Sequence, residues 1–337
     1  MHLPSILAEH RLLPDSLIRY GIRKQLATHS QWLEKNPRTT DSWIEELNSR
    51  VIAEASEQSK EQHYEVPTDY FNLALGPHLK YSCCIWDETT DSLEKAEEAA
   101  LKLTCERAGL QNGQSILELG CGWGSLSLWM AEHHPQSTIT AMSHSKTQKA
   151  HIENQAQIRN LKNLEVITSD INDFQTEDCF DRIVSLEMFE HLRNHQKIFD
   201  HLNLWLKPDG MVFIHVFVHK KETYLFEVEH ERDWMAQYFF TGGIMPSVDL
   251  LPKSARAFKE VARWPVNGKH YSKTLEAWLQ KQDLHEDKIK ALFKKTYGKD
   301  SALWIQRWRI FYMACSELFA YKNGTEWLVM HYRFTKK

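Results

Sequence analysis

A chain of 337 residues can bury a full hydrophobic core and is longer than a minimal α/β domain needs to be. Its formal net charge of −4 provides no basic footprint for nucleic acid, so no nucleic-acid partner is expected. No apolar run reaches the roughly 20 residues that span a bilayer, which predicts no stable membrane insertion.

The N-terminus and the cysteines indicate a cytoplasmic protein. Residues 1–12 contain Pro, Glu and His and lack the continuous apolar core of a signal peptide. The six cysteines are scattered without a CxxC pair, which predicts reduced thiols rather than a disulfide framework. The 18 histidines lack the paired spacing of a zinc site, so no metal is expected.

Residues 1–62 are predicted to form a helical N-terminal extension. Their pattern is polar and helical from about residue 4 to 60, with a break at Asn36-Pro37. They carry no recognisable chemistry, so we expect either an oligomer contact, as in a homodimer, or a cap on the core. After His63 the texture becomes aromatic and loop-like, and residues 63–337 are assigned to one domain.

Short apolar runs alternate with helical ones after residue 115. Strands are expected near 115–119, 138–142, 164–168, 182–186 and 211–217, and helices near 92–109, 123–133, 145–160 and 194–206. This alternation predicts an α/β fold with a parallel sheet covered by helices on both faces. Lys207–Gly210 is predicted to be a turn. We expect helical segments from 218 to about 255, a mixed region, a helix at 300–322 and a last strand at 326–334.

Residues 116–124 read Ile-Leu-Glu-Leu-Gly-Cys-Gly-Trp-Gly, a strand that runs into a glycine loop. Gly120, Gly122 and Gly124 would let the backbone approach a ligand closely, and the next helix offers unpaired N–H groups. A dinucleotide site requires Gly-x-Gly-x-x-Gly, and Glu118 would repel a pyrophosphate. The loop resembles motif I of the class I methyltransferases, whose ligand S-adenosylmethionine is cationic. An ordinary strand–turn–helix is the alternative from the pattern alone.

The ends of the second and third strands carry polar side chains that suit a nucleoside. Ser143 and Gln148 offer neutral hydrogen bonds of about 1 kcal/mol each, where many nucleotide-binding domains place an acid. Asp170 stands where it could frame an adenine. Ser143 and Asp170 could equally be helix caps.

Glu187, Glu190 and His191 follow the fourth strand at spacing i, i+3, i+4. If a helical turn begins there, the three share one face beside the cofactor. An alkylamine near pKa 10.4 is protonated at pH 7, and freeing its lone pair costs about 4–5 kcal/mol. A carboxylate or imidazole that takes this proton contributes roughly 10²–10⁴ in rate. The alternative is a solvated helix start with acids near the dipole.

Aromatic faces would stabilise a cationic amine by about 0.5–2 kcal/mol each. Most aromatic residues of the C-terminal half must belong to the core, because a Trp-rich helix usually packs rather than binds. The candidates for substrate contact are Trp234, Tyr238, Phe239, Phe240, Trp308 and Phe311.

Several segments together resemble the cyclopropane fatty acid synthase superfamily of methyltransferases, and within it the plant coclaurine N-methyltransferase branch. The resemblance covers roughly residues 60–337. Besides the glycine loop, it is carried by Tyr81-Ser82, Met188–His191, Asp233–Met235, Tyr238–Phe240, Met245–Ser247, Val266–Tyr271, Lys295–Asp300 and Glu317–Phe319.

The resemblance implies a class I methyltransferase fold, a Rossmann-like seven-stranded sheet with helical substrate-covering insertions. These would be a helical lid at about 219–255 and pocket helices at about 271–322. The cofactor would be S-adenosylmethionine. Its implied contacts are Tyr81, Ser82, Glu118, Gly120, Cys121, Gly122, Trp123, Gly124, Ser143, His144, Gln148, Asp170, Ile171, Asn172 and Leu186.

The resemblance also assigns catalytic groups. Glu187, Glu190 and His191 correspond to the set that handles the substrate nitrogen in the N-methyltransferases. The lipid-modifying relatives bind a bicarbonate base through residues that correspond to Glu190, His215, Tyr271 and Cys315, so bicarbonate is a second candidate cofactor. A buried Cys315 would also need no functional explanation.

Three functions follow from these patterns. The first is an S-adenosylmethionine-dependent N-methyltransferase of a small, aromatic amine, and the second is methyl or methylene transfer to unsaturated acyl chains. The third is a non-catalytic cofactor-binding protein. Arg307 stands where the plant branch has an aromatic residue, which makes an acidic group on the substrate conceivable.

Overall fold

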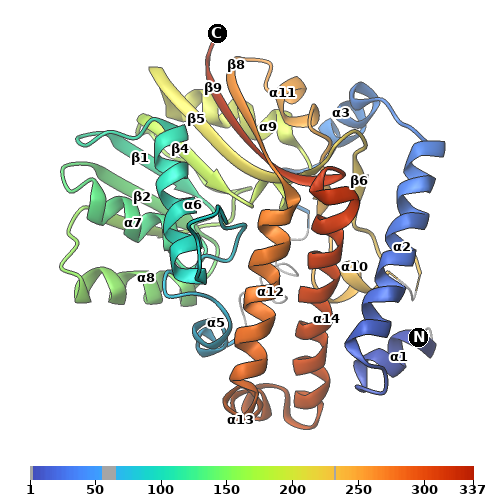
Figure 1. The fold of residues 1–337 in the computed structure, drawn as a ribbon. Helices are drawn as coiled ribbons and strands as arrows, with labels where there is room; N and C mark the ends of the chain where they lie inside the picture. The colour runs from blue at the N-terminus through green and yellow to red at the C-terminus, as the bar shows by residue number, and fades with distance from the viewer. Residues whose placement is uncertain (1–2, 55–65, 231–232) are drawn as a thin grey trace.

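A mixed seven-stranded sheet forms the centre of the protein (Figure 1). The computed structural model describes residues 3–54, 66–230 and 233–337. The strand order is β3-β2-β1-β4-β5-β9-β8, in which β1 to β5 are parallel and β9 runs antiparallel to both β5 and β8. The strands are β1 (Ser115–Leu119), β2 (Thr138–Ser143), β3 (Leu164–Thr168), β4 (Phe180–Leu186), β5 (Leu206–His219), β8 (Phe258–Val266) and β9 (Trp327–Lys336). The predicted seven-stranded α/β class is confirmed: the five strands expected between residues 115 and 217 are parallel, and β8 and β9 add an antiparallel edge.

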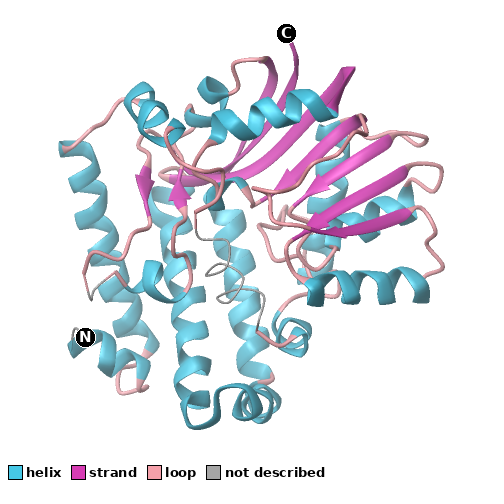
Figure 2. Cartoon of the chain, turned by 180° about the vertical axis from the view of Figure 1, so that it is seen from behind, coloured by secondary structure: helices cyan, strands magenta, loops and turns pink. Residues whose placement is uncertain are grey.

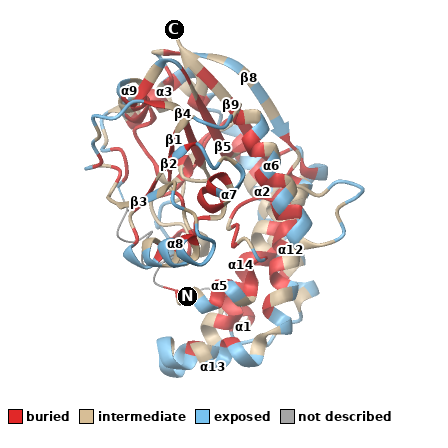
Figure 3. Ribbon diagram, turned by 90° about the vertical axis from the view of Figure 1, so that its left-hand side faces the viewer, coloured by how far each residue is buried: buried red, intermediate tan, exposed pale blue. Residues whose placement is uncertain are grey.

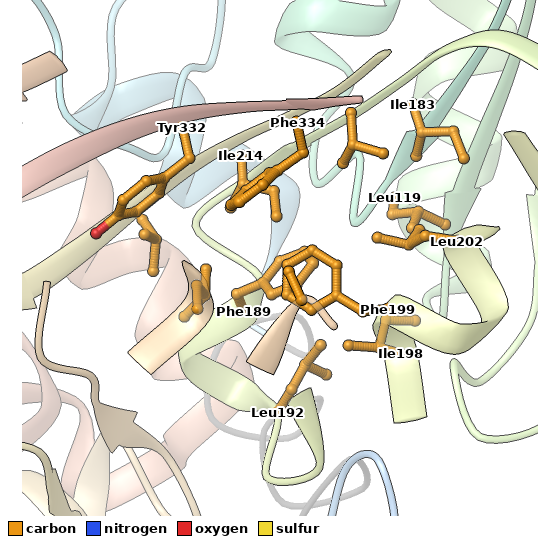
Figure 4. Packing of buried hydrophobic residues seen from close by; sticks show 14 of the residues in the cluster. Leu119, Ile183, Phe189, Leu192, Ile198, Phe199, Leu202, Ile214, Tyr332 and Phe334 are labelled. Atoms are coloured by element: carbon orange, nitrogen blue, oxygen red, sulfur yellow. The ribbon is translucent and has the colours of Figure 1, made fainter. Parts of the chain in front are cut away.

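Helices cover both faces of the sheet, because alternate side chains of each central strand point to opposite sides (Figure 2). Ile116 and Val184 pack against α6 and α7, whereas Leu117 and Ile183 pack with α3 and α9. Figure 4 shows the second face, where rings such as Phe199 fill the space beneath β5 and β9. The helices are α3 (Thr40–Asn48), α6 (Leu93–Ala108), α7 (Ser125–His133), α8 (Lys146–Ile158) and α9 (His195–Trp205).

A bundle of further helices extends from one edge of the sheet and encloses a second core (Figures 1 and 3). Its members are α2 (Asp15–Lys35), α5 (Thr68–Ala74), α12 (Gly268–Leu284), α13 (Glu286–Tyr297) and α14 (Ser301–Ala320). Trp278, Trp308 and Tyr312 are buried inside it. The aromatic richness of the C-terminal half therefore supplies packing first. No helix within the described ranges is long and apolar enough to cross a membrane.

The N-terminal extension lies as a cap on this bundle and is fixed by ion pairs. Arg19 donates to both carboxylate oxygens of Glu276 at 2.7 and 2.8 Å, and Arg309 joins Asp15 at 2.6 Å. Such two-pronged pairs are the most directional ion pairs available to a protein. The expected boundary at 62/63 lies outside the described residues, and the homodimer stays a prediction.

Residues 219–255 hold far less helix than expected. They contain the short helices α10 (Trp234–Tyr238) and α11 (Leu250–Ser254), and β6 (Tyr224–Leu225) pairs with β7 (Ile244–Met245). Gly242 adopts φ of 71° just before β7, a backbone geometry that ends helical structure and favours glycine. The charged and aromatic pattern therefore reflects a loop-rich segment.

Two elements near the sheet edge also differ from expectation. Lys207–Gly210, expected as a turn, lies within β5, where the pairing with β4 shifts register between Phe180 and Arg182. The irregular pairing accommodates residues that would otherwise form a turn. β8 falls in the region left as mixed: its side chains alternate regularly in exposure, but charged residues and Pro265 interrupt the apolar pattern of its sequence.

Close packing at the start of α12 makes Gly268 a sensitive position. A Cβ atom there would overlap the carbonyl oxygens of Phe319 and Trp327, which are backbone atoms and cannot rotate away. Gly268→Ala should therefore lower the free energy of unfolding by roughly 1–3 kcal/mol. Gly21→Ala on exposed α2 meets nothing within 4 Å and should raise it by about 0.5–1 kcal/mol. Urea unfolding of both variants measures the contrast, and equal stabilities would contradict it.

Candidate active site

A cleft of about 580 Å³ opens where the parallel strands β1 to β4 end. β2 and β4 flank β1 on opposite sides, so the chain switches direction there, and ligands of open α/β sheets bind at such a point. The predicted residues that line the cleft are Gly120, Gly122, Ser143, His144, Gln148, Asp170, Ile171, Glu187 and His191. Ala53, Met142, Ser169 and Met188 also line it, and the sequence did not single them out.

The three glycines of the loop serve different purposes. A Cβ on Gly122 would meet nothing within 4 Å, so this residue leaves the cleft open to a ligand. A Cβ on Gly120 would press on the Met188 side chain at 2.9 Å, and one on Gly124 would press on Ile152 of α8 at 2.5 Å. Gly124 thus makes room for α8, and its contact with a cofactor stays a prediction.

The side chains between these glycines point into the protein. Cys121 packs with α8, and Trp123 lies against Phe71 with ring centroids 5.2 Å apart. Neither lines the cleft among the described residues. The side chains of Cys121 and Trp123 are thus turned away from the loop. Their predicted contact with a cofactor could come only from main-chain atoms, and it stays a prediction.

Ser143 and Gln148 form a donor-presenting pair at the end of β2. The Ser143 hydroxyl donates to Gln148 Oε1 at 2.6 Å and accepts from the Ser145 N–H at 3.0 Å. Ser145, not Ser143, is the cap of α8. The Gln148 carbonyl is thus engaged, while its buried Nε2 has no hydrogen-bond partner among the described residues. Since buried donors are normally satisfied, this amide is suited to an acceptor on a ribose or adenine.

Asn172 anchors the N-terminal extension beside the cleft. It accepts from the Ala53 N–H at 3.1 Å and donates to the Ala53 carbonyl at 2.9 Å. It also donates to Asp170 Oδ1 from both its N–H and its side chain. Asn172 therefore does not line the cleft as expected; it holds Ala53 there instead.

The acid before the glycine loop does not face the cleft. Glu118 is buried and accepts a hydrogen bond from the Ser127 hydroxyl on α7. Burial raises its pKa to about 8, because no cation compensates it. The expectation that Glu118 attracts a cationic ligand directly is not supported, since the side chain turns into the strand–helix interface.

Other predicted cofactor residues lie near the cleft without lining it. Ser82 accepts from Lys80 Nζ at 2.6 Å, Tyr81 lies 5.5 Å from Trp278 between ring centroids, and Leu186 packs on the sheet core. Their contacts with a cofactor stay predictions.

Glu187 is held by donors from three separate segments. Its carboxylate accepts from the Cys83 N–H at 2.9 Å and from the Tyr271 hydroxyl at 2.5 Å, and its Oε1 lies within hydrogen-bond distance of His215 Nε2, at 3.0 Å. Its φ of 48° lies in the left-handed region, which a non-glycine residue adopts only when its surroundings impose it. This strain aims the carboxylate at the donors while leaving Glu187 on the cleft wall.

Burial raises the pKa of Glu187 to about 7, and the Lys80 cation, the Cys83 N–H and Tyr271 oppose that rise. Lys80 is fully buried and donates to Ser82 and to the Cys83 carbonyl. The carboxylate is therefore poised to gain or lose a proton near neutral pH.

Glu187, Glu190 and His191 do not share one helix face, because Glu190 is buried whereas His191 lines the cleft. Glu187 precedes the short 3₁₀ turn Phe189–His191 and is not helical. Glu190 is fully buried and accepts from the Phe217 N–H of β5 at 2.7 Å, while its second oxygen meets no hydrogen-bond donor in the part of the chain that the structure describes. Burial and the nearby Glu187 charge raise the pKa of Glu190 well above its usual value. His191 lines the cleft with Glu187.

Arg307 is already neutralised by the N-terminal helix α1 (Leu3–Glu9). Its guanidinium pairs with buried Glu9 at 3.2 Å and lies 3.9 Å from the Tyr238 ring centroid. Trp234 Nε1 donates to the same carboxylate at 2.6 Å. The expectation that Arg307 binds an acidic substrate is therefore not supported, because its charge and the Tyr238 face are both engaged.

The remaining aromatic candidates pack on one another. Phe239 stacks on Phe311 at 4.5 Å and meets Trp308 edge-on at 5.0 Å between ring centroids. Phe240 lies 4.7 Å from the His191 ring, which places it nearest the cleft. None of the six aromatic candidates for substrate contact is among the described residues that line the cleft, so their role stays a prediction.

The structure does not favour a bicarbonate base. His215 and Tyr271, which would hold it, both donate to the carboxylate of Glu187. Burial raises the pKa of the Cys315 thiol to about 12, so it remains protonated. The Glu187 carboxylate already occupies these two side chains, and a bicarbonate ion at the same place would be repelled by its negative charge.

Sequence reasoning missed four residues around Glu187: Lys80, Cys83, Arg107 and His331. Lys80 and Cys83 flank the Tyr81-Ser82 motif, and that proximity was a usable signal. Arg107 at the end of α6 and His331 on β9 join His215 only through the tertiary fold. No local pattern marks them.

Comparison with known proteins places this site in context. The mycolic acid cyclopropane synthetase family model matches residues 52–327. (S)-coclaurine N-methyltransferase of Thalictrum flavum subsp. glaucum is 36% identical over 97% of this chain and 93% of its own. Cyclopropane-fatty-acyl-phospholipid synthase of Escherichia coli K12 is 30% identical over 88% of this chain and 76% of its own. A crystal structure of coclaurine N-methyltransferase with N-methylheliamine and S-adenosylhomocysteine (SAH) superposes with a TM-score of 0.94, at 34% identity and 98% coverage of both chains.

Gly122→Ala tests the glycine loop against a matched control. Gly122 (φ 53°) and Gly113 (φ 89°) both have open space at the Cβ position, but only Gly122 lines the cleft. Each substitution should cost about 1–2 kcal/mol of stability through backbone strain. Calorimetric titration with SAH should show at least about tenfold weaker binding for Gly122→Ala alone. Equal affinities in the two variants would remove the loop from the cofactor site.

Proposed function

Because the chain belongs to the mycolic acid cyclopropane synthetase family and is an S-adenosylmethionine-dependent methyltransferase, we propose that it methylates the nitrogen of a small aromatic amine. The observation that carries the proposal is the carboxylate of Glu187 on the wall of the cofactor cleft, with a pKa near 7. It is placed to take the proton that blocks the lone pair of an ammonium substrate.

The protein's residues divide the work between two ends of the cleft. S-adenosylmethionine, when bound, supplies a sulfonium methyl group as the electrophile. Gly122 and Gln148 belong to the cofactor end, where they offer open backbone and a free amide donor. Glu187 accepts the proton of the ammonium, whose nitrogen is then free to attack the methyl carbon in line with the sulfur.

The contacts of Arg307 support a substrate amine that carries no acidic group. Arg307, the one cation among the residues predicted to contact the substrate, is balanced by Glu9, so an acidic substituent would gain no free partner from it. The Escherichia coli relative keeps acyl-chain modification as the competing function. Glu187 already forms hydrogen bonds with His215 and Tyr271. This argues against acyl-chain modification, because a bicarbonate base needs those two side chains.

An assay with methyl-labelled S-adenosylmethionine tests the proposal directly. We expect label in aromatic secondary amines and none in phospholipids with unsaturated chains, as read by mass spectrometry. Labelled lipid would favour the acyl-chain function. Tight cofactor binding without transfer to any amine or lipid would indicate a non-catalytic protein.

Glu187→Gln should lower kcat by about 10²–10⁴-fold, because the amide cannot take a proton. The dissociation constant for SAH should change less than about threefold. In the wild type, kcat/KM should rise with pH through about 7 as the carboxylate forms, and this acid limb should vanish in Glu187→Gln.

Glu326→Gln provides the matched control for this substitution. Glu326 is also a buried glutamate beside a histidine, His219 at 3.3 Å, but it joins β9 to the N-terminal extension away from the cleft. Its kcat and acid limb should match the wild type. An equal loss of turnover and of cofactor affinity in Glu187→Gln would refute the assigned role.

A further inference from the structure

A chain of hydrogen bonds leads from Glu187 on the cleft wall across β5 and β9 to Arg107 on α6. His215 Nε2 lies 3.0 Å from Glu187 Oε1, and His215 Nδ1 lies 2.9 Å from His331 Nε2. His331 Nδ1 in turn lies 2.9 Å from Arg107 Nη1. His215 and His331 are direct partners in the β5–β9 register, so the sheet holds their rings side by side.

The guanidinium at the end fixes the direction of every bond in this chain. Arginine has only donors and keeps its protons, so Arg107 must donate to His331 Nδ1. A neutral His331 then carries its hydrogen on Nε2 and donates it to His215 Nδ1. Neutral His215 likewise carries its hydrogen on Nε2 and donates to Glu187. Burial is the main cause that lowers the pKa of both histidines well below the usual value, which agrees with neutral rings.

We propose that Arg107 is a positioning residue that, through His331 and His215, fixes their tautomers and so holds Glu187 as a carboxylate. The proposal deepens the proposed function and rests on it for the role of Glu187. Arg107 never meets the substrate. It determines whether the Nε2 atom that His215 presents to Glu187 carries a hydrogen, and Glu187 is the residue that meets the substrate.

Reversal of the chain shows what Arg107 prevents. Without a donor at His331 Nδ1, the two rings could carry their hydrogens on Nδ1, so that His215 Nε2 would present a lone pair to Glu187. Two lone pairs facing each other repel, and the contact survives only if Glu187 is protonated and donates. Loss of Arg107 thus favours the acid form of Glu187, which cannot take a proton from the amine.

The chain does not conduct the proton away. Every hydrogen in it already points toward Glu187, and Arg107 cannot accept a proton at its far end. His215 and His331 are 3% and 2% exposed, so bulk water does not substitute for Arg107 at the inner positions. The proton that Glu187 receives must return to solvent through the cleft.

Other charged or titratable groups face Glu187 from several elements and stay in place when Arg107 is changed. They are Lys80 and Cys83 before α6, Glu190 after β4, Tyr271 on α12 and Cys315 on α14. A change in the titration of Glu187 on substitution of Arg107 therefore reports on the histidine chain or on the Arg107 charge.

Two further substitutions separate those two causes. Arg107→Gln removes the charge but keeps an N–H donor for His331. Arg333→Met removes a neighbouring cation, which lies 5.5 Å from the Trp264 ring centroid, against 5.1 Å for Arg107, and which donates to the Arg107 carbonyl rather than to a histidine. Arg107→Met removes both donor and charge.

The first readout is the tautomer of His215 and His331 in ¹⁵N-histidine-labelled protein, assigned with His215→Asn and His331→Asn. We expect hydrogen on Nε2 of both rings in the wild type, Arg107→Gln and Arg333→Met, and hydrogen on Nδ1 of His215 in Arg107→Met. Hydrogen on Nδ1 of His215 in the wild type would overturn the proposal, even if no variant folds.

The second readout is the acid limb of kcat/KM with the amine substrate. Arg107→Met should move it upward by about one pH unit, so that activity at pH 6 falls about tenfold while SAH affinity is unchanged. Arg107→Gln and Arg333→Met should leave it near the wild-type position. An equal shift in Arg333→Met would mean a charge effect and sink the proposal. The tautomer readout does not depend on activity, so it also separates this inference from a failure of the proposed function.

Discussion

The burial of one carboxylate, that of Glu187, is the constraint on which the rest of the site depends. A buried anion is costly unless hydrogen-bond donors and a cation compensate it. Here a main-chain N–H, an imidazole and a phenol donate to it, and the Lys80 ammonium lies nearby. These groups come from segments almost 190 residues apart in the chain, so the site exists only when the fold is complete.

The antiparallel strands β9 and β8 help to build the surroundings that Glu187 requires. β9 must run antiparallel beside β5 to bring His331 opposite His215, and β8 then covers its other edge. α12 starts at Gly268 in close contact with the end of α14 and the start of β9, which sets Tyr271 three residues later. The last strands are thus part of the active site's support.

The sequence allowed the strands at 115–119 and 164–168, the glycine loop and Glu187 to be predicted, because each is encoded by a local pattern. Polar residues at strand ends converge in any parallel sheet, which is why Gln148 and Asp170 were found. Arg107, His331 and Ala53 could not be found, because their partners lie more than 100 residues away. The close approach of Ile152 to Gly124 could not be predicted either, since it arises only when α8 packs on the loop.

The two glutamates after β4 show how one site avoids two adjacent negative charges. Hydrogen-bond donors and Lys80 hold the pKa of Glu187 near 7. Glu190 has one donor, a second oxygen without a partner among the described residues, and the charge of Glu187 beside it, so its pKa is raised well above the usual value. Environments that push two carboxyl pKa values apart separate a proton acceptor from a neutral acid. One anion can balance one incoming cation. Transfer of the ammonium proton to Glu187 leaves the net charge of the site unchanged, but it turns an ion pair into two neutral groups and frees the nitrogen lone pair before the methyl group moves.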